Sequence, residues 1–414
     1  MSDQNNSWRL TLTPVDSWYF RESRPHGAAG ADRLESLFPP PVKTLVGAIR
    51  TRLGECLNVD WQAFRQGTAF FEDISINALM GDSDSSGTLR FGPVQIGFGD
   101  QGETLFPWPS VLMEKNEGGR LYRYARLQPG SVEHCDLGKV ALPEMISNGQ
   151  DMSGSKVPEN QYIGRQWLEQ VLRGETPPDT SGKQPPQVVL HKDIFTLEPR
   201  LGIAINQTRA TVEDGMLYQT SHLRMAENTG ISITLTGLPE LVARRLQSDF
   251  QASPVIRFGA EGRMAALAME SIESPELPDC PKPAGNEQGF MVMLLSDGDF
   301  GPVRESPLPG FKPALTDDQQ TVWRGQLHGI EAELHCVMAG KPVRRGGWDL
   351  KNGRPTAMKS YVPAGSCYFL KPLDGASVFD AMALHGQAIG NQTEWGYGRI
   401  LCGLWLHKKS SNKH

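Results

Sequence analysis

The sequence has few cysteines and no long hydrophobic run, which excludes several classes of protein. Its six cysteines are scattered over 414 residues without a C-x-x-C pair, so neither a zinc site nor a disulfide framework is predicted. The longest apolar run, residues 290–295, is too short to cross a membrane, and residues 1–8 are polar, without a hydrophobic signal core. We therefore expect a cytoplasmic protein with no membrane partner, metal or cofactor.

The chain also lacks an excess of positive charge. Its formal net charge is −6 at pH 7, whereas a protein that binds nucleic acid with its whole surface is usually basic. Any contact with nucleic acid must therefore be local. The 44 glycines and 30 prolines follow no short period, which indicates many turns and long irregular loops.

Hydrophobic periodicity predicts strands and helices in both halves of the chain. Residues 8–12 and 231–235 alternate apolar and polar side chains, as in half-buried strands, and residues 290–295 read as a buried strand. Residues 45–53 place their apolar side chains on one helical face. A strand, a long loop and an amphipathic helix can begin a ferredoxin-like β-α-β unit. The Gly- and Pro-rich residues 174–187 are the best candidate for a boundary.

Four segments have the pattern of one protein family. They are residues 14–25 with 38–51, residues 198–203 with 215–218, residues 257–263, and residues 346–350 with 362–369 and 396–399. In this order and spacing they resemble the third subunit of the Cmr complex, the type III-B CRISPR effector, which belongs to the RAMP superfamily. The resemblance runs from residue 13 to residue 405. One departure is Ala260, where the family tends to have glycine.

The resemblance implies an α+β fold with two ferredoxin-like (RRM-like) domains that carry long loop and hairpin insertions. We place these domains at residues 1–187 and 188–414. It also implies a subunit without nuclease activity that contacts the 5′ tag of the guide crRNA. Its expected neighbours are the large polymerase-like subunit and a backbone RAMP subunit, and target RNA is an indirect partner.

Basic residues near the first predicted helix are the first candidates for RNA contact. Arg21 and Arg24 lie in the loop before this helix, Lys43 and Thr44 open it, and Arg50 lies within it. Phosphates are bound by guanidinium and ammonium groups and by the unpaired amides of a helix start. The alternative is that these charges form a solvated face.

Two C-terminal segments supply the other candidates. Residues 345–369 predict a hairpin that turns at Asn352-Gly353, and the basic residues Arg344, Arg345, Lys351 and Lys359 lie on or beside it. We expect Trp348 to pack in the core. Gly396, Tyr397, Gly398 and Arg399 form a G-x-G-R turn whose successive amides can make an anion nest, or simply a tight turn.

His26 leaves a second function open. It lies in the basic N-terminal loop, and some RAMP proteins are endoribonucleases that process precursor crRNA with a histidine there. A metal-independent cut needs a general acid or base with a pKa near neutrality. No second residue pairs with His26 convincingly, so an RNA-contacting loop histidine is the favoured interpretation. The equivalent subunit of a type III-A complex is a further alternative.

Overall fold

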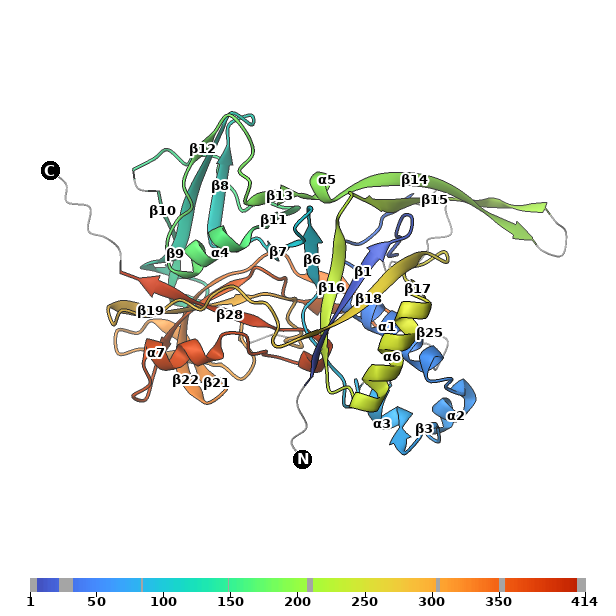
Figure 1. Cartoon of the computed structure of the whole chain (residues 1–414). Helices are drawn as coiled ribbons and strands as arrows, with labels where there is room; N and C mark the ends of the chain where they lie inside the picture. The colour runs from blue at the N-terminus through green and yellow to red at the C-terminus, as the bar shows by residue number, and fades with distance from the viewer. Residues whose placement is uncertain are drawn as a thin grey trace.

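The computed structural model describes residues 6–21, 33–82, 85–147, 149–206, 211–302, 306–349 and 354–407. Within these ranges residues 33, 203–206, 211–218, 348–349 and 354–355 are described by their backbone only. The fold is mixed and rich in sheet, and two large sheets organise it (Figure 1).

The first sheet has nine strands from distant parts of the chain. Their order is β13 (Val188–Leu190), β11 (Gln161–Ile163), β7 (Glu103–Pro107), β6 (Gln95–Phe98), β16 (Gly230–Thr236), β1 (Ser7–Pro14), β18 (Met264–Ile272) and β17 (Val255–Arg257), with β5 (Arg90–Phe91) paired to β16. Strand β1 is antiparallel to both neighbours, with Leu10 opposite Ile233 on one side and Met269 on the other.

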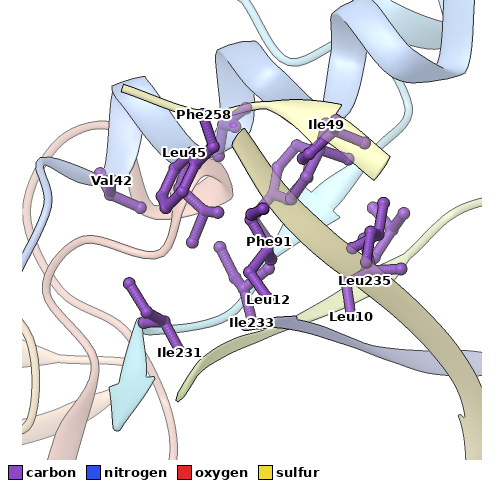
Figure 2. Packing of buried hydrophobic residues seen from close by; sticks show 14 of the residues in the cluster. Leu10, Leu12, Val42, Leu45, Ile49, Phe91, Ile231, Ile233, Leu235 and Phe258 are labelled. Carbon is purple, nitrogen blue, oxygen red and sulfur yellow. The ribbon is translucent and has the colours of Figure 1, made fainter. Parts of the chain in front are cut away.

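Two helices pack on this sheet and enclose its core. They are α1 (Val42–Cys56), which follows β1, and α6 (Glu240–Ala252), which follows β16. Figure 2 shows Leu45 and Ile49 of α1 over Leu12 and Ile233 of the strands, and all four are at most 1% exposed. Each fully buried aliphatic side chain contributes about 1.5–3 kcal/mol, so this cluster fixes α1 on the sheet.

Four smaller elements follow α1 in the chain. They are α2 (Trp61–Gln66), β3 (Phe70–Phe71), β4 (Ile74–Ser75) and α3 (Ile76–Met80). Asp60 caps α2 through the amides of Gln62 and Ala63, and Gly67 ends it in the left-handed conformation.

An inserted sheet comes from segments on both sides of β11 in the chain. It contains β8 (Leu112–Asn116), β9 (Leu121–Cys135), β10 (Gly138–Ile146) and β12 (Thr180–Ser181). Helix α4 (Arg165–Leu172) packs against it, whereas α5 (His191–Ile194) lies between β13 and β14. The buried guanidinium of Arg126 on β9 donates to the carbonyl oxygen of Val171 at 2.6 Å. A cation at the end of a helix is favourable, so this contact ties the insertion to α4.

A long two-stranded arm leaves the body next to the first sheet. Its strands are β14 (Phe195–Asn206) and β15 (Thr211–Met225), and the short β2 (Arg33–Leu34) pairs with β15 in parallel. Figure 1 shows the arm extending away from the rest of the molecule.

The second sheet is C-terminal and has six strands. Their order is β20 (Lys312–Leu315), β21 (Thr321–Leu327), β22 (Ile330–Met338), β27 (Cys367–Pro372), β19 (Glu287–Leu294) and β28 (Ile400–Leu406). Helix α7 (Val378–Ala381) and the short 3-10 helices η1 (Met382–Leu384) and η2 (Thr393–Trp395) connect β27 to β28. A hairpin of β23 (Val343–Arg345) with β26 (Lys359–Tyr361) and β24 (Trp348–Asp349) with β25 (Arg354–Pro355) leaves this sheet.

The predicted local elements are largely present, but strand pairing does not follow the predicted division after residue 187. Strand β1 pairs with β16 and β18, which lie beyond that residue. The Gly- and Pro-rich residues 174–187 join the inserted sheet, because Thr180 pairs with Tyr122 and the carbonyl of Gln187 accepts from Gly164. Composition indicated a loop there, but a loop inside an insertion separates no domains.

Candidate nucleic-acid interface

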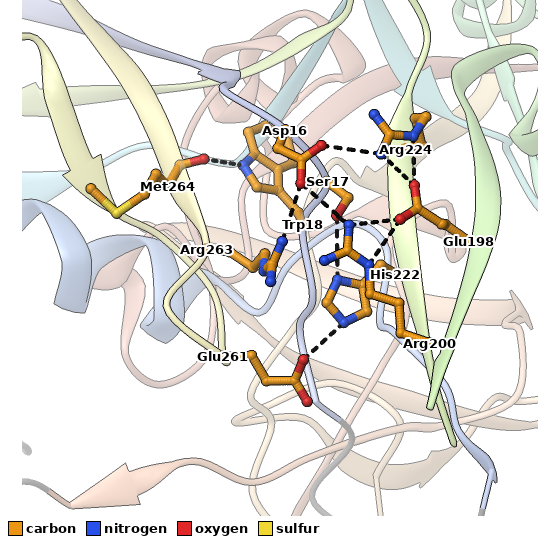
Figure 3. Close-up of polar contacts among 10 residues, drawn as sticks. All are labelled: Asp16, Ser17, Trp18, Glu198, Arg200, His222, Arg224, Glu261, Arg263 and Met264. Atoms are coloured by element: carbon orange, nitrogen blue, oxygen red, sulfur yellow. Dashed lines mark hydrogen bonds and ion pairs between the residues drawn. The ribbon is translucent and has the colours of Figure 1, made fainter. Parts of the chain in front are cut away.

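The base of the arm is held by a shared carboxylate (Figure 3). Asp16, in the loop after β1, accepts hydrogen bonds from Arg200 of β14 at 3.3 Å and Arg224 of β15 at 3.1 Å. Arg263, just before β18, donates to the same carboxylate at 3.2 Å. The amide of Ser17 and the guanidiniums of Arg200 and Arg224 hold the pKa of Asp16 below its ordinary value. One acidic residue thus joins both strands of the arm to the body.

A second carboxylate completes the pairing of these arginines. Glu198 of β14 accepts from Arg200 at 2.6 Å and also pairs with Arg224. The two guanidiniums lower the pKa of Glu198. Because the arm-base arginines face carboxylates, their charge is largely neutralised and is poorly available to a phosphate. Their contribution is to hold the arm in place.

His222 of β15 lies beneath this network and is completely buried. Its Nδ1 lies 3.3 Å from the hydroxyl of Ser17 and its Nε2 lies 3.1 Å from Glu261, while its ring stacks on Tyr19 with centroids 4.9 Å apart. Burial lowers the pKa of His222, and the nearby charge of Arg200 adds to this effect.

Ser17, His222 and Glu261 are bonded in series, as in a nucleophile relay. However, Ser17 is only 1% exposed, and its hydroxyl accepts a hydrogen bond from Arg200 at 3.0 Å. A substrate cannot reach this hydroxyl in the described conformation, so the series is part of the anchor.

A different set of basic residues meets at Trp395, between the two large sheets. Lys43 Nζ and Arg50 Cζ of α1 each lie 5.4 Å from the centre of the Trp395 ring. Arg50 also donates to the carbonyl oxygen of Asp82 at 2.7 Å. Burial lowers the pKa of Arg50 to about 10, although the charge of Asp82 opposes the shift. The structure thus brings predicted residues of the N-terminal helix beside the predicted glycine-rich turn.

The other two predicted N-terminal residues that the structure describes are exposed. Thr44 is exposed, but its amide donates to the carbonyl oxygen of Pro41 at 2.9 Å. The prediction that this amide is unpaired and open to a phosphate is therefore wrong. Arg21 lies in an isolated bridge with Ser36 before α1, and its side chain is exposed.

The prediction of an anion nest in the G-x-G-R turn is also wrong. The amides of Gly396, Gly398 and Arg399 donate to Thr393, Asp297 and Ser296 respectively, at 2.9–3.0 Å. Both glycines have positive φ, and a Cβ atom at either would collide with a carbonyl oxygen, that of Gly92 or Ile389. The glycines are needed for close backbone packing between segments.

Tyr397 is 5% exposed and stacks on Tyr361 of β26, with ring centroids 4.9 Å apart. Burial strongly raises the pKa of Tyr397. A base cannot stack on a ring that is already enclosed, so the predicted contact of this side chain with RNA does not fit the structure. The tyrosine pair instead joins the basic hairpin to the turn.

The basic residues of the hairpin differ in their surroundings. Arg345 lies 3.8 Å from Asp297 and Lys359 lies 3.4 Å from Asp299, so both are paired to the segment after β19. Arg344 is exposed and forms no ion pair within the described part of the chain. Among the hairpin's described side chains, Arg344 is therefore the cation most available to a phosphate.

Arg399, in contrast, is partly buried and has no acidic partner among the residues that the structure describes. Its guanidinium donates to the carbonyl oxygen of Gly386, and burial lowers its pKa. The other predicted residues, Arg24, His26 and Lys351, lie outside the described residues, and Trp348 is described by its backbone only.

Sequence reasoning missed the residues that form the arm anchor. Asp16, Arg200 and Arg263 all lie in the segments that carried the family resemblance, but other charged residues of these segments gave the same signal. His222 lies outside those segments, so nothing in the sequence singled it out.

The described ranges contain no cluster of three metal-ligating side chains. No helix in the same ranges is long and apolar enough to cross a membrane.

Comparisons with known proteins agree with the resemblance. No curated protein matches the chain. A chain of the type III-B Cmr-β complex bound to cognate target RNA and AMPPnP is similar, with 15% identity over 87% of this chain and 86% of that chain and a TM-score of 0.40. A chain of the Csm3–Csm4 subcomplex of the type III-A interference complex is also similar, with 10% identity over 87% of this chain and 92% of that chain and a TM-score of 0.33. The family described as CRISPR-associated protein (Cas_Cmr3) matches residues 10–405, so this chain belongs to the Cmr3 family of CRISPR-associated proteins.

Proposed function

We propose that this chain is a non-catalytic RNA-binding subunit of a type III-B CRISPR effector, the Cmr complex, and that it holds the 5′ tag end of the guide crRNA. Within the complex it joins the large polymerase-like subunit to the backbone RAMP subunits. Its contact with target RNA is indirect, through the guide. Family membership is the first support for this proposal.

One structural observation supports RNA contact most directly. Basic side chains from distant parts of the chain gather around η2: Lys43 and Arg50 of α1 lie over Trp395, and Arg399 lies four residues after Trp395, just before β28. In a chain of net charge −6, a local group of cations is where a phosphate backbone is attracted. The arm-base arginines are less suited to this role, because each of them is already paired with Asp16.

We also infer that each large sheet is built on a ferredoxin-like unit. In the first sheet β6, β16, β1 and β18 lie in the spatial order 2-3-1-4 by their position along the chain, with α1 and α6 as the two helices. In the second sheet β22, β27, β19 and β28 lie in the same order, and α7 follows the third strand. The division between the units then falls between β18 and β19.

The test is to purify the chain from cells that also express the large subunit, the backbone subunits and a CRISPR array. The recovered RNA should share one defined 5′ end, and the chain should co-purify with the large subunit at moderate salt. RNA with random 5′ ends, or separate migration of folded subunits, would contradict the proposal. Co-purification with type III-A subunits instead would reassign the complex.

The non-catalytic part of the proposal has its own test. The purified chain should leave precursor crRNA uncut. Site-specific cleavage that disappears in His26→Ala, while the melting temperature is unchanged, would make the chain a processing endoribonuclease.

A further inference from the structure

A pocket of about 570 Å³ lies between the two large sheets, next to η2. Arg90 and Phe91 of β5 line one side of it, and His328, Glu394 and Arg399 line the other. Pockets of about 300–1,000 Å³ are the usual size for small ligands. Both sheets contribute to the walls, so the pocket exists only in the assembled chain.

The two arginines of this pocket carry charges that no carboxylate among the described residues balances. Neither Arg90 nor Arg399 forms an ion pair within the described ranges, and Glu394, the acidic residue of the wall, pairs with neither. Arg90 donates to the carbonyl oxygens of Gly87 and Leu89, at 2.7 and 3.0 Å. Carbonyl oxygens orient a guanidinium but do not cancel its charge.

Arg399 is partly buried, so the lack of an acidic partner among the described residues bears directly on whether it binds an anion. Its guanidinium is bonded to Gly386, and burial alone lowers its pKa. A buried charge without a counter-ion is costly. Two guanidiniums that face one polar pocket without an acidic partner are suited to an anion with several oxygens, above all a phosphate.

His328 adds a hydrogen-bonding group to the same wall. Its Nε2 lies 2.8 Å from the carbonyl oxygen of Ala388, so in the neutral ring this nitrogen donates and Nδ1 is left as an acceptor. An acceptor suits a hydroxyl or amino group of the ligand. A ribonucleotide has a phosphate together with both of these groups.

We propose that this pocket binds one nucleotide of single-stranded RNA, with its phosphate between Arg90 and Arg399. This inference rests on the proposed function and names a subsite for it. The short helix η2 links the two regions, because Glu394 lies in the pocket wall and the next residue, Trp395, contacts Lys43 and Arg50. An RNA strand on the Trp395 surface is therefore next to the pocket.

A free nucleotide carries the same chemistry, so the experiment must separate the two sources. We would measure fluorescence anisotropy of a 5′-labelled single-stranded RNA on the full chain across a salt series, and repeat it with excess AMP. The variants are Arg90→Gln, Arg399→Gln and both together. Arg244→Gln, a 74% exposed arginine on α6, is the matched control.

Each pocket variant should weaken RNA binding about tenfold, because a charge-assisted hydrogen bond is lost. The slope of log affinity against log salt should flatten by about 0.7 for each phosphate contact removed. Arg244→Gln should behave like the wild type, and AMP should compete only weakly. Arg399→Gln loses the hydrogen bond to Gly386 and can therefore lower the melting temperature. In that case the RNA affinity of Arg90→Gln alone tests the pocket.

Three results would overturn the inference. Wild-type affinity and slope in folded pocket variants would remove the pocket from the RNA site while leaving the proposed function standing. AMP that binds the wild type but not the double variant, with RNA affinity unchanged, would make this a free-nucleotide site. Failure of the wild-type chain to bind RNA would remove the proposed function and the pocket together.

Discussion

Arg344 and Arg345 are neighbours in the sequence and have different surroundings in the fold. Arg345 faces Asp297, whereas Arg344 is exposed without an ion pair in the described part of the chain. Asp297 is distant in sequence, so no local pattern reveals which arginine is neutralised. This is the main reason why basic residues were found from the sequence but their individual contributions were not.

The glycine-rich turn offers a direct test of packing at single residues. Gly398→Ala should destabilise the chain by about 3 kcal/mol or more, because the new Cβ would collide with the carbonyl of Ile389 at φ +67°. Gly375→Ala is the matched control, with φ +83° and nothing within 4 Å of the new atom, and should cost about 1–2 kcal/mol. Urea unfolding measures both. Equal losses would contradict the packing account.

A half-buried histidine, His191, makes stability depend on pH. Burial lowers the pKa of His191 to about 4, below its ordinary value of about 6.5. As pH falls from about 6.5 toward 4, the unfolded chain takes up a proton that the folded chain does not. Stability is therefore lost in this window, by at most about 1.4 kcal/mol per pH unit from this group.

His191→Phe should reduce that loss, because the ring contacts with Tyr162 and Phe195 can be kept without a titrating group. Urea unfolding at pH 7 and pH 5 gives the comparison. His134→Phe, at an exposed position, is the control and should keep the wild-type loss. An equal pH dependence in all three proteins would show that His191 does not contribute.

At the scale of the element, the arm depends on its anchor. Asp16→Asn removes the charge that Arg200, Arg224 and Arg263 share. Amides of residues 195–202 and 219–225 should then exchange faster with solvent, by about fivefold, because half-exposed ion pairs stabilise weakly. Asp151→Asn, which removes a surface pair with Lys115, should leave the arm unchanged. Unchanged exchange in Asp16→Asn would contradict the anchor.

The basic hairpin gives a matched pair of variants on one strand. Arg344→Ala should flatten the salt dependence of RNA affinity by about 0.7 without lowering the melting temperature. Arg345→Ala should lower the melting temperature first, because Asp297 would be left without its cation. RNA titration and thermal unfolding of both variants measure these effects. If Arg345→Ala changed the salt dependence and Arg344→Ala lowered the melting temperature, the pairing of Arg345 with Asp297 would have to break when RNA binds.

Elements with a clear hydrophobic period were predictable. The strand at residues 8–12, the helix after Pro41 and the buried strand near residue 290 all formed, because each period matches the face that the core covers. The arm was not predicted as an arm. Its exposed residues, such as Leu201 at 74%, have no covered face to impose a pattern.

At the scale of the whole molecule, the sequence did not show which distant strands pair in one sheet. Thr13 of β1 pairs with Ala266 of β18, although more than half of the chain separates these two residues. All the intervening elements therefore come, in sequence, between two strands that are neighbours in one sheet. Composition marks loops, but it does not show which strands a loop separates. The family could be recognised because its motifs lie at packing junctions, around Asp16 and Arg263 at the base of the arm and around Gly398 in the glycine-rich turn.

The most direct test asks whether cations of both units hold the guide RNA. The measurement is the salt dependence of guide affinity for the assembled complex that contains Lys43→Ala with Arg344→Ala. The slope should flatten by about 1.4, since one phosphate contact is lost from each unit. The control complex carries Arg173→Ala with Arg244→Ala, two exposed arginines paired to glutamates, and should match the wild type. A wild-type slope and affinity in the first complex would contradict the account.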